Sequence, residues 1–376
     1  MDIESSAFYA HEDWTLDKDH RESTTLIKLF QQFQKWMLRS LFQVITLIDL
    51  NTLADARHPQ KVNFQPGYLD RIRTTFSESV LTFLDGIHFL AFHPNAWSHW
   101  TLAGRQQRNE EVSTQFLLES GVWVDPSKKD VRLFVMLSNV MVFRQLILPD
   151  HVQLFDALFQ TSLDAHPLWD AVARLDTLLF DEIMKRKTMR LTDILQDGIL
   201  FSGIDWRRTS KPQSVNGYVS ECLVYLVLIH SEITSILGAC SSSEIMKTAT
   251  SPLLNSPVAQ RQAQQQHQHV LFVRMFTALL EHVLQTFLEC FRQVDVFSEK
   301  GGAMQALVDV CAVQEVLKCY WEGLPSAEAL LRLIHRTVSS QDGGVEVSSD
   351  RMERVHQLVS EWLHASEIEF LCFLSH

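Results

Sequence analysis

The sequence has little of the two residues that build tight turns. Its 376 residues include only 13 glycines and 10 prolines, and long stretches contain neither. A many-stranded sandwich or barrel needs frequent Gly- or Pro-containing turns, so this scarcity disfavours such folds. Because 46% of the residues are hydrophobic and 21% are charged, the composition is that of a folded chain rather than a disordered one. Helices are the favoured secondary structure.

The sequence also lacks the short motifs of the common enzyme classes. It contains no Gly-x-x-x-x-Gly-Lys phosphate loop, no Gly-x-Gly-x-x-Gly dinucleotide turn, no His-Glu-x-x-His zinc pair and no Gly-x-Ser-x-Gly nucleophile elbow. Each of these motifs places a specific group against a phosphate, a metal or a carbonyl. Their absence predicts a protein that is not an enzyme and that uses no cofactor.

Basic residues, long apolar runs and paired cysteines are scarce too. The formal net charge of −12 at pH 7 disfavours nucleic acid as a partner. The longest apolar run, Cys222 to Ile229, is far shorter than the roughly 20 residues of a membrane-spanning helix, so we expect no direct membrane insertion. The six cysteines show no Cys-x-x-Cys spacing and indicate free thiols in a reducing, cytoplasmic compartment.

Histidine is the one residue type that could suggest a metal site. His88, His93 and His99 fall close together beside Trp97 and Trp100. No cysteine or carboxylate stands at regular spacing near them, as a zinc site would require. We therefore predict no metal, and an all-α metal protein is the least favoured of the alternative interpretations.

What the chain does contain is a helical rhythm of apolar residues, which recur every three or four positions over most of its length. We found no internal repeat of fixed period. The predicted fold is all-α, an elongated rod of stacked antiparallel helical bundles. The rhythm predicts helices over 26–50, 68–92, 130–147, 150–163, 168–187, 214–237, 270–296, 303–320, 326–337 and 351–374.

Composition divides this helical chain into three parts. Residues 1–20 are polar and predict a flexible N-terminal tail. Residues 21–198 predict a helical bundle with an irregular segment at 94–129. Residues 199–376 predict a C-terminal helical bundle, interrupted at 240–269 by a Ser-Pro-containing and Gln-rich stretch that we interpret as a disordered loop.

Two groups of polar residues on the predicted helices have alternative interpretations. His230 and Glu232 could be an acid/base pair, but residues two apart on a helix do not face each other, so structural roles are favoured. Lys185, Arg186, Lys187 and Arg190 could bind phosphate, but the predicted helix ends among them. There cations complement the helix dipole, so a solvated helix terminus is the preferred interpretation.

Three motifs follow one another in the second half of the chain: a turn from Ile194 to Trp206, a helix from Tyr218 to Ile233, and the Gly-Gly-Ala-Met-Gln-Ala helix start at 301–306. Their order resembles the C-terminal helical region of the Sec-five family of exocyst subunits. The resemblance extends from about Phe83 to Thr337. The residues that carry it, which we expect to be structural, are Asp205, Trp206, Tyr218, His230, Glu232, Gly301, Gly302, Met304 and Gln305.

These motif residues suit particular structural tasks. Gly301 and Gly302 are expected to form a helix-to-helix turn with a positive φ. Asp205 and Trp206 are expected to anchor a loop against the bundle.

The resemblance implies a rod of helical bundles, as in multisubunit tethering complexes, that tethers secretory vesicles to the plasma membrane before fusion. Its implied partners are the other exocyst subunits, with small GTPases or fusion machinery as further partner classes. Its implied location is cytoplasmic and peripheral, at plasma membrane sites of secretion. The main alternative is a subunit of another helical-rod tethering complex, at the Golgi or the endosome.

Overall fold

The structure is a computed structural model that describes residues 66–93, 128–159, 162–204, 206, 212–240, 257–294, 302–321, 323–341 and 349–374. Every element in these ranges is a helix, so the predicted all-α class is confirmed there. The tail expected at 1–20, the helix predicted at 26–50 and the segment 94–127 of the predicted irregular stretch lie outside the described residues.

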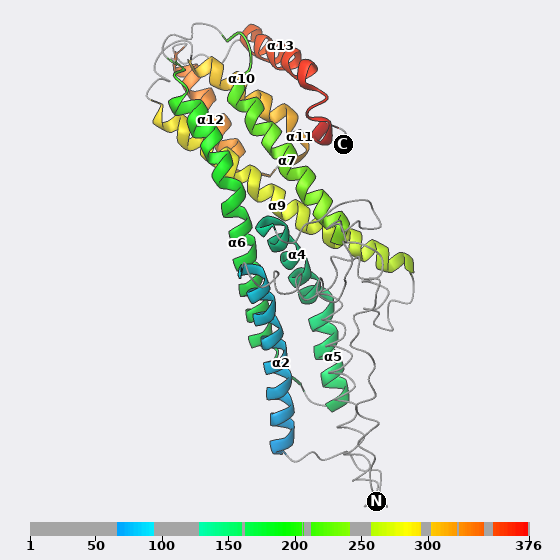
Figure 1. Cartoon of the computed structure of the whole chain (residues 1–376). Coiled ribbons are helices and arrows are strands. Elements are labelled where there is room, and N and C mark those ends of the chain that lie inside the picture. The colour runs from blue at the N-terminus through cyan, green and yellow to red at the C-terminus, as the bar shows by residue number, and fades with distance from the viewer. Residues whose placement is uncertain are drawn as a thin grey trace, which may run out of the picture. The chain divides into compact units, whose positions relative to one another are not determined.

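The chain divides into two compact units, whose helices are drawn in Figure 1. Unit 1 comprises Met1–Asp176 and Ile236–His267, and unit 2 comprises Thr177–Ser235 and Gln268–His376. The division therefore falls inside helix α6 (His166–Gln196), whereas composition suggested 198/199. Sequence reveals a boundary through linker residues, and α6 has no linker at this point because the helix is continuous.

In unit 1 the core is built around helix α4 (Lys129–Val142), which is buried on all sides. Helix α4 is buried from Val131 to Met141, and it packs against α2 (Pro66–Phe92). It continues through a π-helical turn, η2 (Phe143–Ile147), into α5 (Leu148–Phe159). The inward face of α2 consists of Phe76, Val80, Leu84, Ile87 and Ala91, which recur every three or four residues.

Specific contacts fix these helices of unit 1 to one another. The rings of Phe76 on α2 and Phe155 on α5 lie 5.1 Å apart. The buried Arg132 on α4 donates from Nε to the Ala91 carbonyl oxygen at 3.1 Å. That carbonyl lies in the last turn of α2, where helices leave backbone oxygens without an intrahelical partner. Arg132 of α4 therefore supplies a hydrogen-bond donor to a backbone carbonyl at the C-terminal end of α2.

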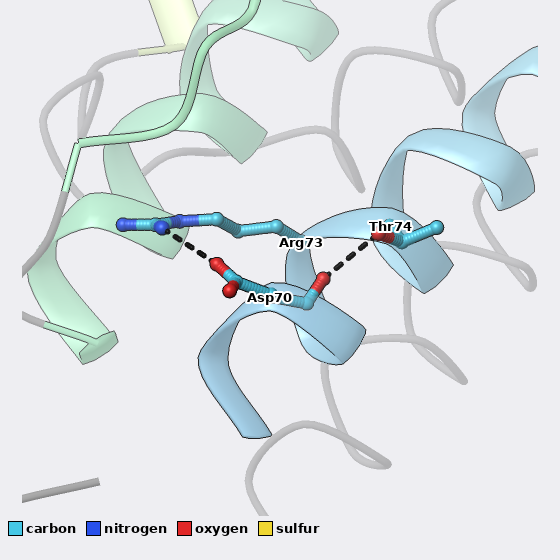
Figure 2. A network of polar contacts seen from close by, with 3 residues as sticks. All are labelled: Asp70, Arg73 and Thr74. Atoms are coloured by element: carbon cyan, nitrogen blue, oxygen red, sulfur yellow. Dashed lines mark hydrogen bonds and ion pairs between the residues drawn. The ribbon is translucent and has the colours of Figure 1, made fainter. Parts of the chain in front are cut away.

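Local contacts join residues at the beginning of α2, as Figure 2 shows. Arg73 donates from Nη1 to Oδ1 of Asp70 at 3.2 Å, and Thr74 donates its hydroxyl to the Asp70 carbonyl oxygen at 2.8 Å. Both contacts join residues three or four apart on one solvated helix face. Such pairs contribute a few tenths of a kcal/mol and do not indicate a functional site.

In unit 2 the central element is α10 (Gly302–Val316), which packs against α12 (Pro325–Gln341) and α13 (Ser349–Ser366). Almost every residue of α10 is buried. A helix that is apolar on all sides belongs in a core, which explains this position. The other elements that lie wholly or partly in unit 2 are α6, η3 (Asp197–Phe201), α7 (Gly217–Cys240), α9 (Pro257–Gln293), α11 (Lys318–Trp321) and α14 (Leu371–Leu374).

The structure corrects the loop that composition predicted at 240–269. Helix α9 begins at Pro257, so the Gln-rich part of that stretch is helical. Glutamine, alanine and arginine are good helix formers, and proline suits the first position of a helix. The polar composition was wrongly interpreted as flexibility. Residues 241–256 lie outside the described part of the chain.

Three stretches of the described helices are long and apolar enough to cross a membrane, by length and composition alone. They are Lys129–Gln153, Gly217–Leu237 and His269–Gln293. The expectation of no direct membrane insertion stays a prediction.

Candidate functional site

The most distinctive polar feature of unit 2 is a fully buried carboxylate, Asp309, in the middle of α10. It follows Leu307 and Val308 in an otherwise apolar stretch. Gln305 lies four residues earlier, and residues four apart share one helix face. Asn216 and Tyr218, at the start of α7, approach the same carboxylate. We call Asp309, Gln305, Asn216 and Tyr218 the Asp309 cluster.

Each carboxylate oxygen of Asp309 accepts two hydrogen bonds. Oδ1 accepts from the backbone N–H of Asn216 and from Nε2 of Gln305, both at 3.0 Å. Oδ2 accepts from Nδ2 of Asn216 at 2.7 Å and from the Tyr218 hydroxyl at 2.6 Å. A carboxylate has about four lone-pair sites, so these four donors fill them. The cluster thereby ties the first turn of α7 to the middle of α10.

The electrostatics of the cluster follow from its burial. Burial raises the pKa of Asp309 to about 6, although its four hydrogen bonds act in the opposite direction. Burial, followed by the nearby Asp309 charge, raises the pKa of Tyr218 well above its usual value. A buried carboxylate held only by neutral donors is a costly arrangement unless every donor is in place.

We predict that Asp309 makes unit 2 more stable as the pH falls from 7 to 5. The pKa of Asp309 is about 6 in the folded state, against 3.8 for an aspartate in the unfolded chain, so in this interval the folded state binds more protons than the unfolded state. The free energy of unfolding then falls as the pH rises, by about 1 kcal/mol between pH 5 and pH 7.

The pH effect of Asp309 is best measured as the difference in stability between the wild type and a variant without this carboxylate. Burial lowers the pKa of His151 in unit 1 to about 4, so His151 makes the folded protein less stable on acidification. Urea unfolding of the wild type and of Asp309→Asn, followed by circular dichroism, should be compared between pH 5 and 7.5. The advantage of the wild type should grow toward pH 5. Parallel curves would contradict the prediction.

A second close contact within unit 2 is formed by Trp206 and Gly302. The buried Trp206 donates from Nε1 to the Ile199 carbonyl oxygen at 3.0 Å and lies edge-on to Phe291. A Cβ added to Gly302 would lie 2.6 Å from the Trp206 carbonyl oxygen, so only glycine fits there. The positive φ expected at Gly302 is wrong, because what this position requires is space.

His230 and Glu232 lie in different surroundings. The His230 ring stands nearly perpendicular to the rings of Phe272, Phe276 and Phe373, with centroids 5.0 to 5.8 Å away. Glu232 instead accepts a hydrogen bond from Nζ of Lys187 at 2.7 Å. The two residues therefore have separate partners, as their spacing on α7 suggested.

The basic residues of α6 differ from their predicted setting. The helix runs on to Gln196, so Lys187 is in its interior rather than at its end. The side chain of Lys187 is only 7% exposed, and it forms an ion pair with Glu232 of α7. The solvated-terminus interpretation is wrong for this residue, because the helix has no stop signal before Gly198.

The structure thus brings together only some of the residues that the family motifs contain. Tyr218 and Gln305 meet at Asp309, and Trp206 meets Gly302. Met304 is half-buried on α10. Asp205 and Gly301 lie outside the described residues. Sequence analysis missed Asn216 and Asp309, although an aspartate within an apolar run, four residues after Gln305, was a usable signal.

The arrangement in unit 2 is suited to holding helices together. The acceptor sites of Asp309 are filled by internal donors, so the carboxylate is not free to bind a metal or a substrate. Within the described residues, no group of three or more His, Cys, Asp or Glu side chains could hold a metal ion. His88 and His93 lie against Phe92 and Phe89 on α2, and His99 lies outside the described part.

Comparison with known proteins identifies a family whose model matches this chain. The family model described as exocyst complex component Sec5 matches residues 2–373. Exocyst complex component 2 of Homo sapiens is 20% identical over 203 residues, and that of Mus musculus is 21% identical over 205 residues. Each alignment covers 54% of this chain and 18% of the relative, so the chain spans less than a fifth of their length. No solved structure matches the chain.

Proposed function

Because the chain belongs to the Sec5 family of exocyst components, we propose that it is a non-enzymatic subunit of the exocyst, which tethers secretory vesicles to the plasma membrane before fusion. The observation that carries the proposal is the family match over residues 2–373. The proposed location is cytoplasmic, at plasma membrane sites of secretion. The proposed partners are the other exocyst subunits, with small GTPases and fusion machinery as further classes.

The described residues support a structural rather than a chemical role. The buried polar side chains Asp309, Tyr218 and Gln305 are occupied with one another, and Lys187 is paired with Glu232. An active site instead aims a nucleophile, base or oxyanion donor at a space that a substrate can enter.

The proposal is tested by isolating the tagged chain from its own cells and identifying the co-purifying proteins by mass spectrometry. We expect the other exocyst subunits to be recovered, and an unrelated helical protein with the same tag serves as the control. Recovery of a Golgi or endosomal tethering complex in their place, or of no tethering subunit, would overturn the proposal.

A further inference from the structure

The outer face of α6 and η3 carries an exposed, mixed apolar and acidic edge in unit 2. It consists of Met189, Asp193, Asp197 and Phe201, which we call the α6–η3 edge. All four are exposed, Met189 by 64% and Phe201 by 73%. Phe201 is the most exposed of the described phenylalanines. Two large apolar side chains thus stand at the ends of the edge, with two carboxylates between them.

The π-helical turn places Phe201 on this edge. Met189 and Asp193 on α6 and Asp197, the first residue of η3, are spaced four residues apart, so they lie along one side of the helix. At four-residue spacing an α-helix drifts steadily around its axis, because a turn holds 3.6 residues. The wider π-turn of η3 advances each residue by a smaller angle and returns Phe201 to the line.

Phe201 is also held firmly, although it is exposed. In the adjoining turn, Ser202 donates its hydroxyl to the Gly198 carbonyl oxygen at 2.6 Å, and Trp206 donates to the Ile199 carbonyl oxygen. Gly203 follows with a φ of 75°, in the left-handed region that favours glycine. Aromatic side chains on a rigid support are the usual anchors of protein interfaces, because little entropy is lost when they bind.

From this geometry we infer that the α6–η3 edge docks a helix of another subunit, one that carries Lys or Arg residues between two apolar contacts. Met189 and Phe201 are separated by about 18 Å along the helix, which is about twelve residues of a partner helix lying alongside. Within the described residues neither Asp193 nor Asp197 forms an ion pair, so both remain available to a basic partner.

The same charges disfavour other occupants of the edge. Anionic lipid headgroups and nucleic acid would meet two carboxylates at its centre. In a symmetric pairing of two copies through α6, aspartates would face aspartates, and such like-charge contacts cost several kcal/mol. A basic helix of a different chain is the occupant that the charges favour. This inference rests on the proposed function for the expectation that the partner is an exocyst subunit.

Photo-crosslinking tests the inference on the full chain in its own cells. The photoreactive amino acid p-benzoylphenylalanine replaces Phe201 in one sample and the exposed Phe89 of unit 1 in a matched control. We expect the probe at 201, but not at 89, to label a helical peptide of another subunit that contains Lys or Arg. Absence of a crosslink, or a crosslink to lipid or to a second copy, would overturn the inference.

Charge reversal provides the second readout. The double variant Asp193→Lys/Asp197→Lys should keep its thermal unfolding midpoint and lower recovery of the labelled subunit by about tenfold or more. Reversing the partner's basic residues should restore recovery. If the double variant recovers the labelled subunit as well as the wild type does, and exocyst subunits still co-purify, the α6–η3 edge is not the docking site. The proposed function would be unaffected by that result. A crosslink to a basic helix of a protein outside the exocyst would support docking at the α6–η3 edge and would contradict the proposed function.

Discussion

Replacing Asp309 with alanine should lower the free energy of unfolding of unit 2 by about 4 kcal/mol. The substitution removes the acceptor for four donors at once, from Asn216, Tyr218 and Gln305. Each buried donor left without an acceptor costs about 1–3 kcal/mol, and the losses are not fully additive. The small alanine also leaves a cavity in which few replacement contacts can form. Chemical denaturation followed by circular dichroism measures the loss.

Two comparisons separate this effect from a general cost of losing an aspartate. Asp193→Ala removes an exposed carboxylate of the same unit and should change the stability by less than about 0.5 kcal/mol. In a double-mutant cycle, Asp309→Ala and Tyr218→Phe should show a coupling of about 1–3 kcal/mol, because they share a hydrogen bond. Equal losses at Asp193 and Asp309 would show that the cluster does not stabilise the unit.

Sequence could reveal the helices but not this cluster. The apolar rhythm of α2 or α7 repeats every few residues, so a short window of sequence contains the whole signal. Two partners of Asp309, Tyr218 and Asn216, lie 91 and 93 residues away in the chain. Motif resemblance drew attention to Tyr218 and Gln305, but not to the carboxylate that both of them bind. The spacing of Gln305 and Asp309 is a local signal, but their pairing with Asn216 and Tyr218 leaves no local pattern.

The same limit explains the errors at helix ends. The basic cluster was interpreted as a solvated terminus because the helix was predicted to end at 187, yet Lys187 pairs with a glutamate 45 residues later, and the helix continues. The predicted loop before α9 relied on polar composition, yet glutamine-rich sequence also suits a helix. A tertiary contact accompanies the longer α6, and the helix propensity of glutamine explains the earlier start of α9.

The second large effect is expected at Gly198, in the π-helical turn η3. A Cβ at this position would lie 2.2 Å from Cβ and 2.5 Å from Cγ of Tyr218. Atoms at these distances overlap, and the atoms met are the base of a side chain that the Asp309 cluster holds in place. Gly198→Ala should therefore force η3 and α7 apart and destabilise unit 2 by about 3 kcal/mol, the upper part of the range for overpacking.

Gly86 provides a matched control for the same chemical change. It is an exposed glycine within α2, and a Cβ added there meets nothing within 4 Å. Gly86→Ala should raise stability by about 0.5–1 kcal/mol, because alanine restricts the unfolded chain and favours the helix. Opposite signs for one substitution at two helical glycines, measured by thermal and urea unfolding, would show that contact with Tyr218 sets the cost at Gly198. A neutral Gly198→Ala would mean that η3 and α7 do not approach so closely in solution.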